Sequence, residues 1–184
     1  MTNIGVLFVN FVIGAAAFFF LARFVLQLSR ADFYNPISQS VVTLTEPVLR
    51  PLRTLLRPIG SFDPSSFTVS WALQALQVWA LGALGATAAG TALQIAALAL
   101  FQTLMLLTYI FVGAIFIIVI ASWFVQGGFH PILALLSQVT EPIVGPIRRF
   151  MPDLGGIDLS PMVAIFGLFV LQEVLRIIFL NLPL

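Results

Sequence analysis

The residues best placed to do chemistry are the charged side chains of two similar stretches, 35–66 and 130–161. Shifted by 95 positions, the stretches align without a gap, and ten of their 32 positions are identical. At this composition chance would give roughly two or three identities, so the match predicts an internal duplication. Both stretches contain a Thr-Glu-Pro motif, at 45–47 and at 140–142, which is the most specific signal in the chain.

The glutamate of the first motif has two interpretations. In the structural one, Thr45 caps a helix that restarts after a proline break, and Glu46 lies in its first turn, paired with Arg50 or Arg53. In the functional one, the carboxylate is held at the membrane interface for an ion or a partner. We favour the structural role, because capped helix starts of this kind are common.

The arginines near both motifs are candidate contacts for anionic lipid headgroups or for an acidic patch on a partner. Arginine keeps its charge and can bind two phosphate oxygens at once. The simpler interpretation is that they set topology and solvate a polar helix face, and the two roles are compatible. In the second stretch a glycine replaces the first arginine after the motif. The candidate contact set is Glu46, Arg50, Arg53, Arg57, Glu141, Arg148 and Arg149.

A second polar group lies within the predicted membrane spans: Gln74, Gln77, Gln172, Glu173 and Arg176. A carboxylate in hydrocarbon is costly unless it is paired, and Arg176 follows Glu173 by three residues on the same helix face. We favour hydrogen-bonded contact between helices, and the alternative is an ion or solute path. A path predicts that Glu173→Gln abolishes flux at an unchanged protein level.

The sequence lacks the residue patterns typical of catalytic, metal-binding and nucleic-acid-binding sites. There is no cysteine, so no disulfide or thiolate site is possible, and His130 alone does not make a metal site. No serine-nucleophile elbow or phosphate-binding glycine loop is present. A net charge of +1 does not indicate the basic surface that nucleic-acid binding requires. We therefore expect no enzyme activity, no metal and no cofactor.

The composition is that of a membrane protein. Of the 184 residues 60% are hydrophobic and 8% are charged, with a mean hydropathy of +1.11. Soluble domains carry about 25% charged residues, so this chain could not cover its apolar surface in water. The N-terminus lacks the basic segment of a signal peptide and predicts the start of a retained span.

The pattern predicts an all-α integral membrane protein with four transmembrane helices, arranged as a tandem parallel duplication of span, interfacial segment and span. The first repeat is 1–89, with spans 4–28 and 66–88 and an interfacial segment at 35–58. A connection at 90–95 leads to the second repeat, 96–184, with spans 98–124 and 161–182 and an interfacial segment at 130–152. The arginine distribution places both long loops in the cytoplasm and both termini outside.

Several local features follow from the pattern. Prolines 47, 51, 142 and 146 predict a break inside each interfacial segment, which either lies flat or re-enters the membrane. Asp63 and Asp158 are predicted helix caps. Arg23 is expected to extend towards the headgroups. Gly82, Ala86 and Gly90 would form a small-residue helix face for close packing or oligomerisation.

The combination of these motifs resembles the YggT family, called YlmG in some bacteria, with relatives in chloroplasts. The residues that carry the resemblance are Asn35-Pro36, Thr45-Glu46-Pro47, Pro51, Arg53, Gly60 and Asp63-Pro64-Ser65, with their second-stretch counterparts. The second stretch departs at His130, Gly145 and Leu159. The resemblance implies a bacterial inner (plasma) membrane location. It also implies links to cell division, nucleoid and envelope organisation, cytochrome cofactor assembly and osmotic stress tolerance.

Two functions fit this sequence. The first is an organising or assembly factor that binds lipid and a membrane or cytoplasmic protein through its two cytoplasmic segments. A homo-oligomer is compatible with this function. The second is a small oligomeric ion or solute channel or transporter, involved in osmotic stress tolerance. Four spans leave little room for a pore within one monomer.

Overall fold

The computed structural model describes residues 4–88, 90–124, 130–151 and 158–181, and these form six helices without a strand. The helices are α1 (Ile4–Leu28), α2 (Pro36–Leu52), α3 (Pro64–Ala83), α4 (Ala92–Phe124), α5 (Pro131–Phe150) and α6 (Ser160–Leu180). The prediction of an all-helical protein is confirmed for this part of the chain.

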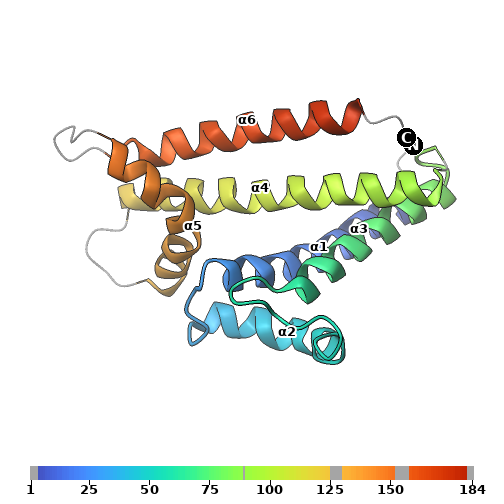
Figure 1. The fold of residues 1–184 in the computed structure, drawn as a ribbon, viewed down its shortest axis with the longest axis horizontal. Coiled ribbons are helices and arrows are strands. Elements are labelled where there is room, and N and C mark those ends of the chain that lie inside the picture. The colour runs from blue at the N-terminus through green and yellow to red at the C-terminus, as the bar shows by residue number, and fades with distance from the viewer. Residues whose placement is uncertain (1–3, 89, 125–129, 152–157, 182–184) are drawn as a thin grey trace.

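The helices α1, α3, α4 and α6 run alongside one another, and the two helices with internal prolines, α2 and α5, lie at one end (Figure 1). α1 packs against α3, α3 against α4, and α4 against α6. The chain leaves α1 into α2 and returns along α3. It then runs down α4 into α5 and returns along α6. α2 and α5 therefore lie at the same end of the bundle, opposite the connection between α3 and α4.

Three helices are long and apolar enough to cross a membrane: α1, α4 and α6. α3 has 20 residues but does not reach their hydropathy, because serines and glutamines interrupt its apolar residues. Large hydrophobic side chains are exposed along the three apolar helices, including Phe11, Phe116 and Phe166. Such surfaces are stable in contact with lipid. These helices make the chain a membrane protein.

The apolar core lies where α1, α4, α5 and α6 meet, near the end that carries α2 and α5. Its most buried members include Leu21, Val25 and Ile115, and Val139 of α5 packs among them. One face of α2 is also buried, at positions 38, 41, 45 and 49, which are spaced by three and four as a helix requires. The core therefore fixes α2 and α5 against the long helices.

The connection between α3 and α4 corrects one prediction. α3 ends at Ala83, and Gly85 adopts a φ of 69° that suits glycine. The backbone N–H of Ala86 then bonds the carbonyl of Leu81, which closes the helix end. Ala86 and Gly90 therefore lie outside the helix, and the predicted small-residue face is wrong. α4 begins at Ala92, six residues before the predicted span.

The predicted breaks in the proline-rich segments are also wrong. α2 continues through Pro47 and Pro51, and α5 continues through Pro142 and Pro146. In Figure 1 the ribbon of α5 changes direction along its length, as expected where proline removes a backbone bond. Both helices continue past their prolines, so no new helix starts at the Thr-Glu-Pro motif.

Candidate functional site

The first Thr-Glu-Pro motif receives an arginine from the neighbouring membrane helix. Nη2 of Arg23 in α1 donates to Oε2 of Glu46 at 2.6 Å, and Nη1 donates to Oγ1 of Thr45 at 3.1 Å. The Arg23 side chain is only 6% exposed. It therefore does not extend towards the headgroups as its position predicted. The motif neutralises a buried arginine, in keeping with the rule that intramembrane charges are paired.

Thr45 supports this pairing from inside α2. Its hydroxyl donates to the carbonyl of Val41 at 2.7 Å and accepts from Arg23. It therefore lies within the helix and does not cap one, which corrects the predicted role. Because the hydroxyl is engaged on both sides, it holds the guanidinium in one position beside Glu46.

The network continues through a second arginine to the start of α3. Nη1 of Arg53 lies 3.4 Å from Oε2 of Glu46, and its Nη2 donates to Oδ2 of Asp63 at 2.6 Å. Asp63 also accepts from the backbone N–H of Ser65 and from the hydroxyl of Ser66. The predicted cap at Asp63 is confirmed. Two arginines and two carboxylates thus form one neutral network that joins α1, α2 and α3.

This environment changes the acidity of Asp63. Burial raises its pKa, and hydrogen bonds from Arg53 and Ser66 lower it by more, so the pKa lies below the ordinary value of 3.8. The carboxylate is therefore charged at any physiological pH. Its role is to hold Arg53 and the first turn of α3 in place.

The second motif lacks the incoming arginine. Its network has one cation, Arg148, which lies 3.5 Å from Glu141 and donates from Nε to Asp158 at 2.9 Å. The position that matches Arg23 at the 95-residue offset is Ile118. Arg148 and Glu141 are 53% and 62% exposed. The second network is therefore more open and carries one more negative than positive charge.

The second network also lowers the pKa of its aspartate, Asp158. Hydrogen bonding from Ser160 is the main cause of this lowering. Burial raises the pKa by less, so the pKa of Asp158 lies below its ordinary value. The backbone N–H of Ser160 donates to Oδ1 of Asp158 at 2.9 Å. The residue that directly precedes α6 is Leu159, which makes no side-chain cap, so the predicted cap position at Asp158 is wrong by one residue.

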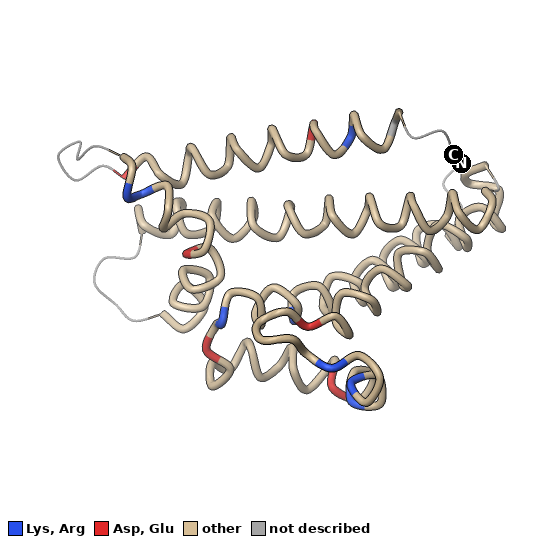
Figure 2. The backbone as a smooth tube through the Cα atoms, in the orientation of Figure 1, with Lys and Arg blue, Asp and Glu red and all other residues tan. Residues whose placement is uncertain are grey.

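Three arginines of the candidate contact set face outwards. Arg50, Arg57 and Arg149 are exposed, and none of them makes an ion pair with any residue that the structure describes. Arg30, just after α1, shares these properties. The charges gather at the end with α2 and α5, apart from one pair on α6 (Figure 2). This end of the molecule is the candidate contact surface.

The two stretches are joined directly at this end. The side-chain amide of Asn35 caps α2 by accepting from the N–H of Ile37, and its nitrogen donates to the carbonyl of Pro131 at 2.7 Å. The hydroxyl of Ser29 donates to the carbonyl of Val139. His130, which matches Asn35, makes no such cap. Asn35 therefore fixes the position of α2 relative to α5.

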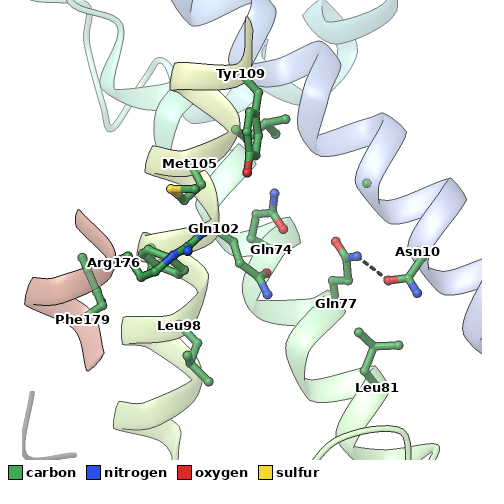
Figure 3. Close-up of a pocket in the computed structure, with 13 residues that line it drawn as sticks. Asn10, Gln74, Gln77, Leu81, Leu98, Gln102, Met105, Tyr109, Arg176 and Phe179 are labelled. Atoms are coloured by element: carbon green, nitrogen blue, oxygen red, sulfur yellow. Dashed lines mark hydrogen bonds between the residues drawn. The ribbon is translucent and has the colours of Figure 1, made fainter. Parts of the chain in front are cut away.

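The intramembrane polar residues are only partly brought together. Gln74, Gln77 and Arg176 line a cavity of about 670 Å³ between α1, α3, α4 and α6 (Figure 3). Gln172 instead donates to Thr108 at 2.9 Å, and Glu173 lies 3.6 Å from Arg176, with both side chains more than half exposed. The sequence did not single out the other polar lining residues, Asn10, Gln102 and Tyr109.

No metal chemistry is visible at either place. Within the described ranges, no three histidine, aspartate or glutamate side chains gather as metal ligands would. At the first motif, sequence reasoning missed that Arg23 is the partner of Glu46. The signal was available, because a charge within a span requires a partner and Glu46 is an acidic residue of the adjacent segment.

Comparison with known proteins supplies the family context. The family model described as CCB3/YggT matches residues 2–84 and again 97–179, and the second match lies 95 positions after the first. The chain is 37% identical over 149 residues to the uncharacterized protein PA0392 of Pseudomonas aeruginosa, covering 80% of this chain and 76% of the relative. It is 33% identical over 165 residues to the uncharacterized protein YggT of Escherichia coli K12, covering 83% and 78%.

A further relative, an uncharacterized protein of Haemophilus influenzae, is 35% identical over 175 residues, with 91% of this chain and 88% of the relative covered. No solved structure matches the chain.

Proposed function

Since the chain belongs to the CCB3/YggT family, we propose that it is a bacterial inner-membrane organising or assembly factor that acts by binding, without catalytic turnover. α2 and α5 form its contact surface for anionic lipid headgroups and for a protein partner. The observation that carries this proposal is that the arginines fall into two groups. Arg23 and Arg53 pair with carboxylates inside the fold. The others at this end, Arg50, Arg57 and Arg149, are exposed and make no ion pair with a described residue.

The networks support this function by making the surface rigid. An ion pair of Arg23 links α1 to α2, and an ion pair of Arg53 links the end of α2 to the start of α3. A hydrogen bond from Asn35 links the start of α2 to α5. A surface held in one geometry loses little conformational entropy when a partner binds. Exposed arginines on such a surface can engage phosphate or carboxylate groups with two parallel hydrogen bonds.

The proposal includes a topology. α1, α3, α4 and α6 cross the membrane as a tandem duplication, with α2 and α5 at the cytoplasmic interface and both termini outside. Support comes from the two family matches at the offset of the sequence repeat and from the position of α2 and α5 at one end. The arginines gathered there agree with the positive-inside rule. α3 would cross next to α1 and α4, which cover part of its polar face.

The test is to reverse the exposed arginines and leave the networks intact. In the variant Arg50→Glu, Arg57→Glu, Arg149→Glu, we expect normal insertion and thermal stability. We also expect loss of the protein that is crosslinked in cells at stoichiometric yield to the native chain, and reduced retention of phosphatidylglycerol in native membrane discs. A crosslinked partner and lipid content unchanged from the native chain would refute the proposal.

A matched control removes charge elsewhere. Arg176→Gln removes the charge of an exposed arginine of α6, far along the helix from this surface, and places no second carboxylate beside Glu173. It should leave partner and lipid binding unchanged. Arg53→Glu and Arg148→Glu are poor tests, because both residues hold carboxylates of the networks and their loss would disturb the fold.

The second candidate, a small oligomeric ion or solute channel, is favoured by one observation: the polar cavity among the membrane helices. Beyond Tyr109, however, the buried residues Phe111 and Ile115 of α4 belong to the core and fill the space towards α2 and α5. A conducting path would therefore need several chains. Flux in liposomes that is lost on Gln77→Leu would favour this candidate over the first.

A further inference from the structure

The cavity between the membrane helices contains polar groups that the protein itself does not satisfy. Gln74 is only 7% exposed and lines the cavity, and its side-chain amide makes no hydrogen bond to any described residue. Oε1 of Gln102, which lines the same space, is buried and also has no partner there. Unpaired buried amides destabilise a fold, so these groups require a ligand or water to bond them.

The arrangement of the side chains defines a site. In Figure 3, Gln102 extends from α4 towards α3, on which Gln74 and Gln77 lie, and the amide of Gln77 is turned to Asn10 of α1. Gln77 also donates to Asn10 of α1 at 2.8 Å. Tyr109 also lines the space, and Phe101 and Phe179 pack against each other with ring centroids 5.2 Å apart. Four carboxamides therefore line one space together with aromatic side chains.

The lining carries little charge and therefore favours an uncharged ligand. Arg176 is the only charged residue among the lining residues, and Glu173 lies 3.6 Å from its guanidinium. Carboxamides both donate and accept hydrogen bonds without carrying charge. The ligand that satisfies them is neutral and carries several groups that do the same, which is the chemistry of hydroxyl groups.

The cavity adjoins a second hollow. This hollow, of about 420 Å³, shares Leu81, Leu98 and Gln102 with the first and reaches Thr87 and Gly90 of the α3–α4 connection. The apolar core lies near the end that carries α2 and α5. The two hollows together lie in the half of the bundle away from α2 and α5. Its size, about 670 Å³, is within the range of small-molecule sites.

We propose that this cavity binds a polyhydroxylated ligand, a sugar or polyol, through the carboxamides of Gln74, Gln77 and Gln102 with its ring or chain against Phe101 and Tyr109. The same chemistry is supplied by a free sugar or by the headgroup of a glycolipid. The proposal is independent of the arginine surface, because the two sites lie at opposite ends of the bundle.

The experiment uses the full chain in phosphatidylcholine nanodiscs. One arm adds glucose or maltose, and the other includes monoglucosyl diacylglycerol in the bilayer, with occupancy read by native mass spectrometry and by the shift in Tm. Binding in the first arm identifies a free solute, and binding only in the second identifies a lipid headgroup. Binding in neither arm means that the cavity holds water alone and overturns the proposal.

Gln74→Leu is the decisive variant, and Gln172→Leu is its matched control within the membrane helices but outside the cavity. Gln74→Leu should weaken binding at least tenfold and leave the Tm of the ligand-free protein unchanged or higher, because it removes an unpaired buried amide. Gln172→Leu should leave binding unchanged. Equal binding by Gln74→Leu and the native chain would overturn the proposal, as would a Gln74→Leu variant that loses stability without losing affinity.

Discussion

The two Thr-Glu-Pro motifs should differ sharply in what their glutamates contribute to stability. Glu46→Gln removes the charge that compensates Arg23, whose side chain stays buried with Val42 and Thr45 as its remaining acceptors. Removing one partner of a buried ion pair costs about 3–5 kcal/mol. Because Glu46 is itself 40% exposed, we expect a loss near the lower end, about 3 kcal/mol.

Glu141→Gln is the matched control. It alters the same position of the second motif, where the pair with Arg148 spans 3.5 Å between side chains that are more than half exposed. Exposed pairs contribute about 0.2–1 kcal/mol. For a chain of this length each kcal/mol shifts Tm by about 2–4 °C, so Glu46→Gln should lower Tm by about 6–12 °C and Glu141→Gln by less than about 4 °C.

The assay is thermal unfolding of both variants in the same membrane mimetic, followed by tryptophan fluorescence. Equal shifts would refute the reasoning, because they would mean that Arg23 is not buried against Glu46. A second control is the double variant Arg23→Leu, Glu46→Leu. It should recover most of the lost stability, because replacing a buried pair by apolar side chains is often neutral.

Three further predictions follow from the same contacts. Asn35→Ala removes a helix cap and the bond to Pro131, so it should lower stability by about 1–2 kcal/mol, whereas His130→Ala should have little effect, as Tm measurements would show. The lowered pKa of Asp63 contributes stability that is present above the ordinary pKa of 3.8 and lost as the pH falls below it through the lower folded value. Acid titration of Tm should therefore show a drop below about pH 4 that is smaller in Asp63→Asn, and an equal drop would contradict the assigned pairing. The chain has no cysteine, so single-cysteine variants report topology directly: Thr91→Cys should be labelled from outside intact cells and Gln39→Cys only after permeabilisation, and the reverse pattern would invert the proposed orientation.

The broad architecture could be predicted because membrane helices leave a strong signal. The long apolar runs of α1, α4 and α6 require lipid as solvent. Aspartate followed by proline located the start of α3, because this pair fixes a helix cap and its first residue. The family could also be identified from the motifs of the two stretches, and the family model confirms it.

Local propensity failed where tertiary contacts decide. Prolines inside a helix predict a break, yet α2 is held continuous by its buried face and by Arg23. The partner of Glu46 could not be chosen from spacing, since Arg50 is nearer in sequence than Arg53 or Arg23. The end of α3 was misplaced because alanine and glycine permit both a helix and a turn. Only the positive φ of Gly85 distinguishes the two.

The polar cavity could not be predicted from the sequence. Its carboxamides come from α1, α3 and α4, at positions with no common spacing in the sequence. In the sequence, Gln102 and Asn10 are single polar residues within apolar runs. Such single polar residues are ordinary in membrane helices. They become a site only when the helices are packed together.

The most direct measurement of the proposed function is photo-crosslinking in living cells from position 57, on the exposed arginine surface, compared with position 166, on the apolar face of α6. We expect position 57 to yield one defined protein adduct together with anionic lipid, and position 166 to yield lipid alone. The protein adduct should disappear when Arg50 and Arg149 are changed to Glu. The same adducts from both positions, or a position 57 adduct that persists after charge reversal, would contradict a contact surface formed by α2 and α5.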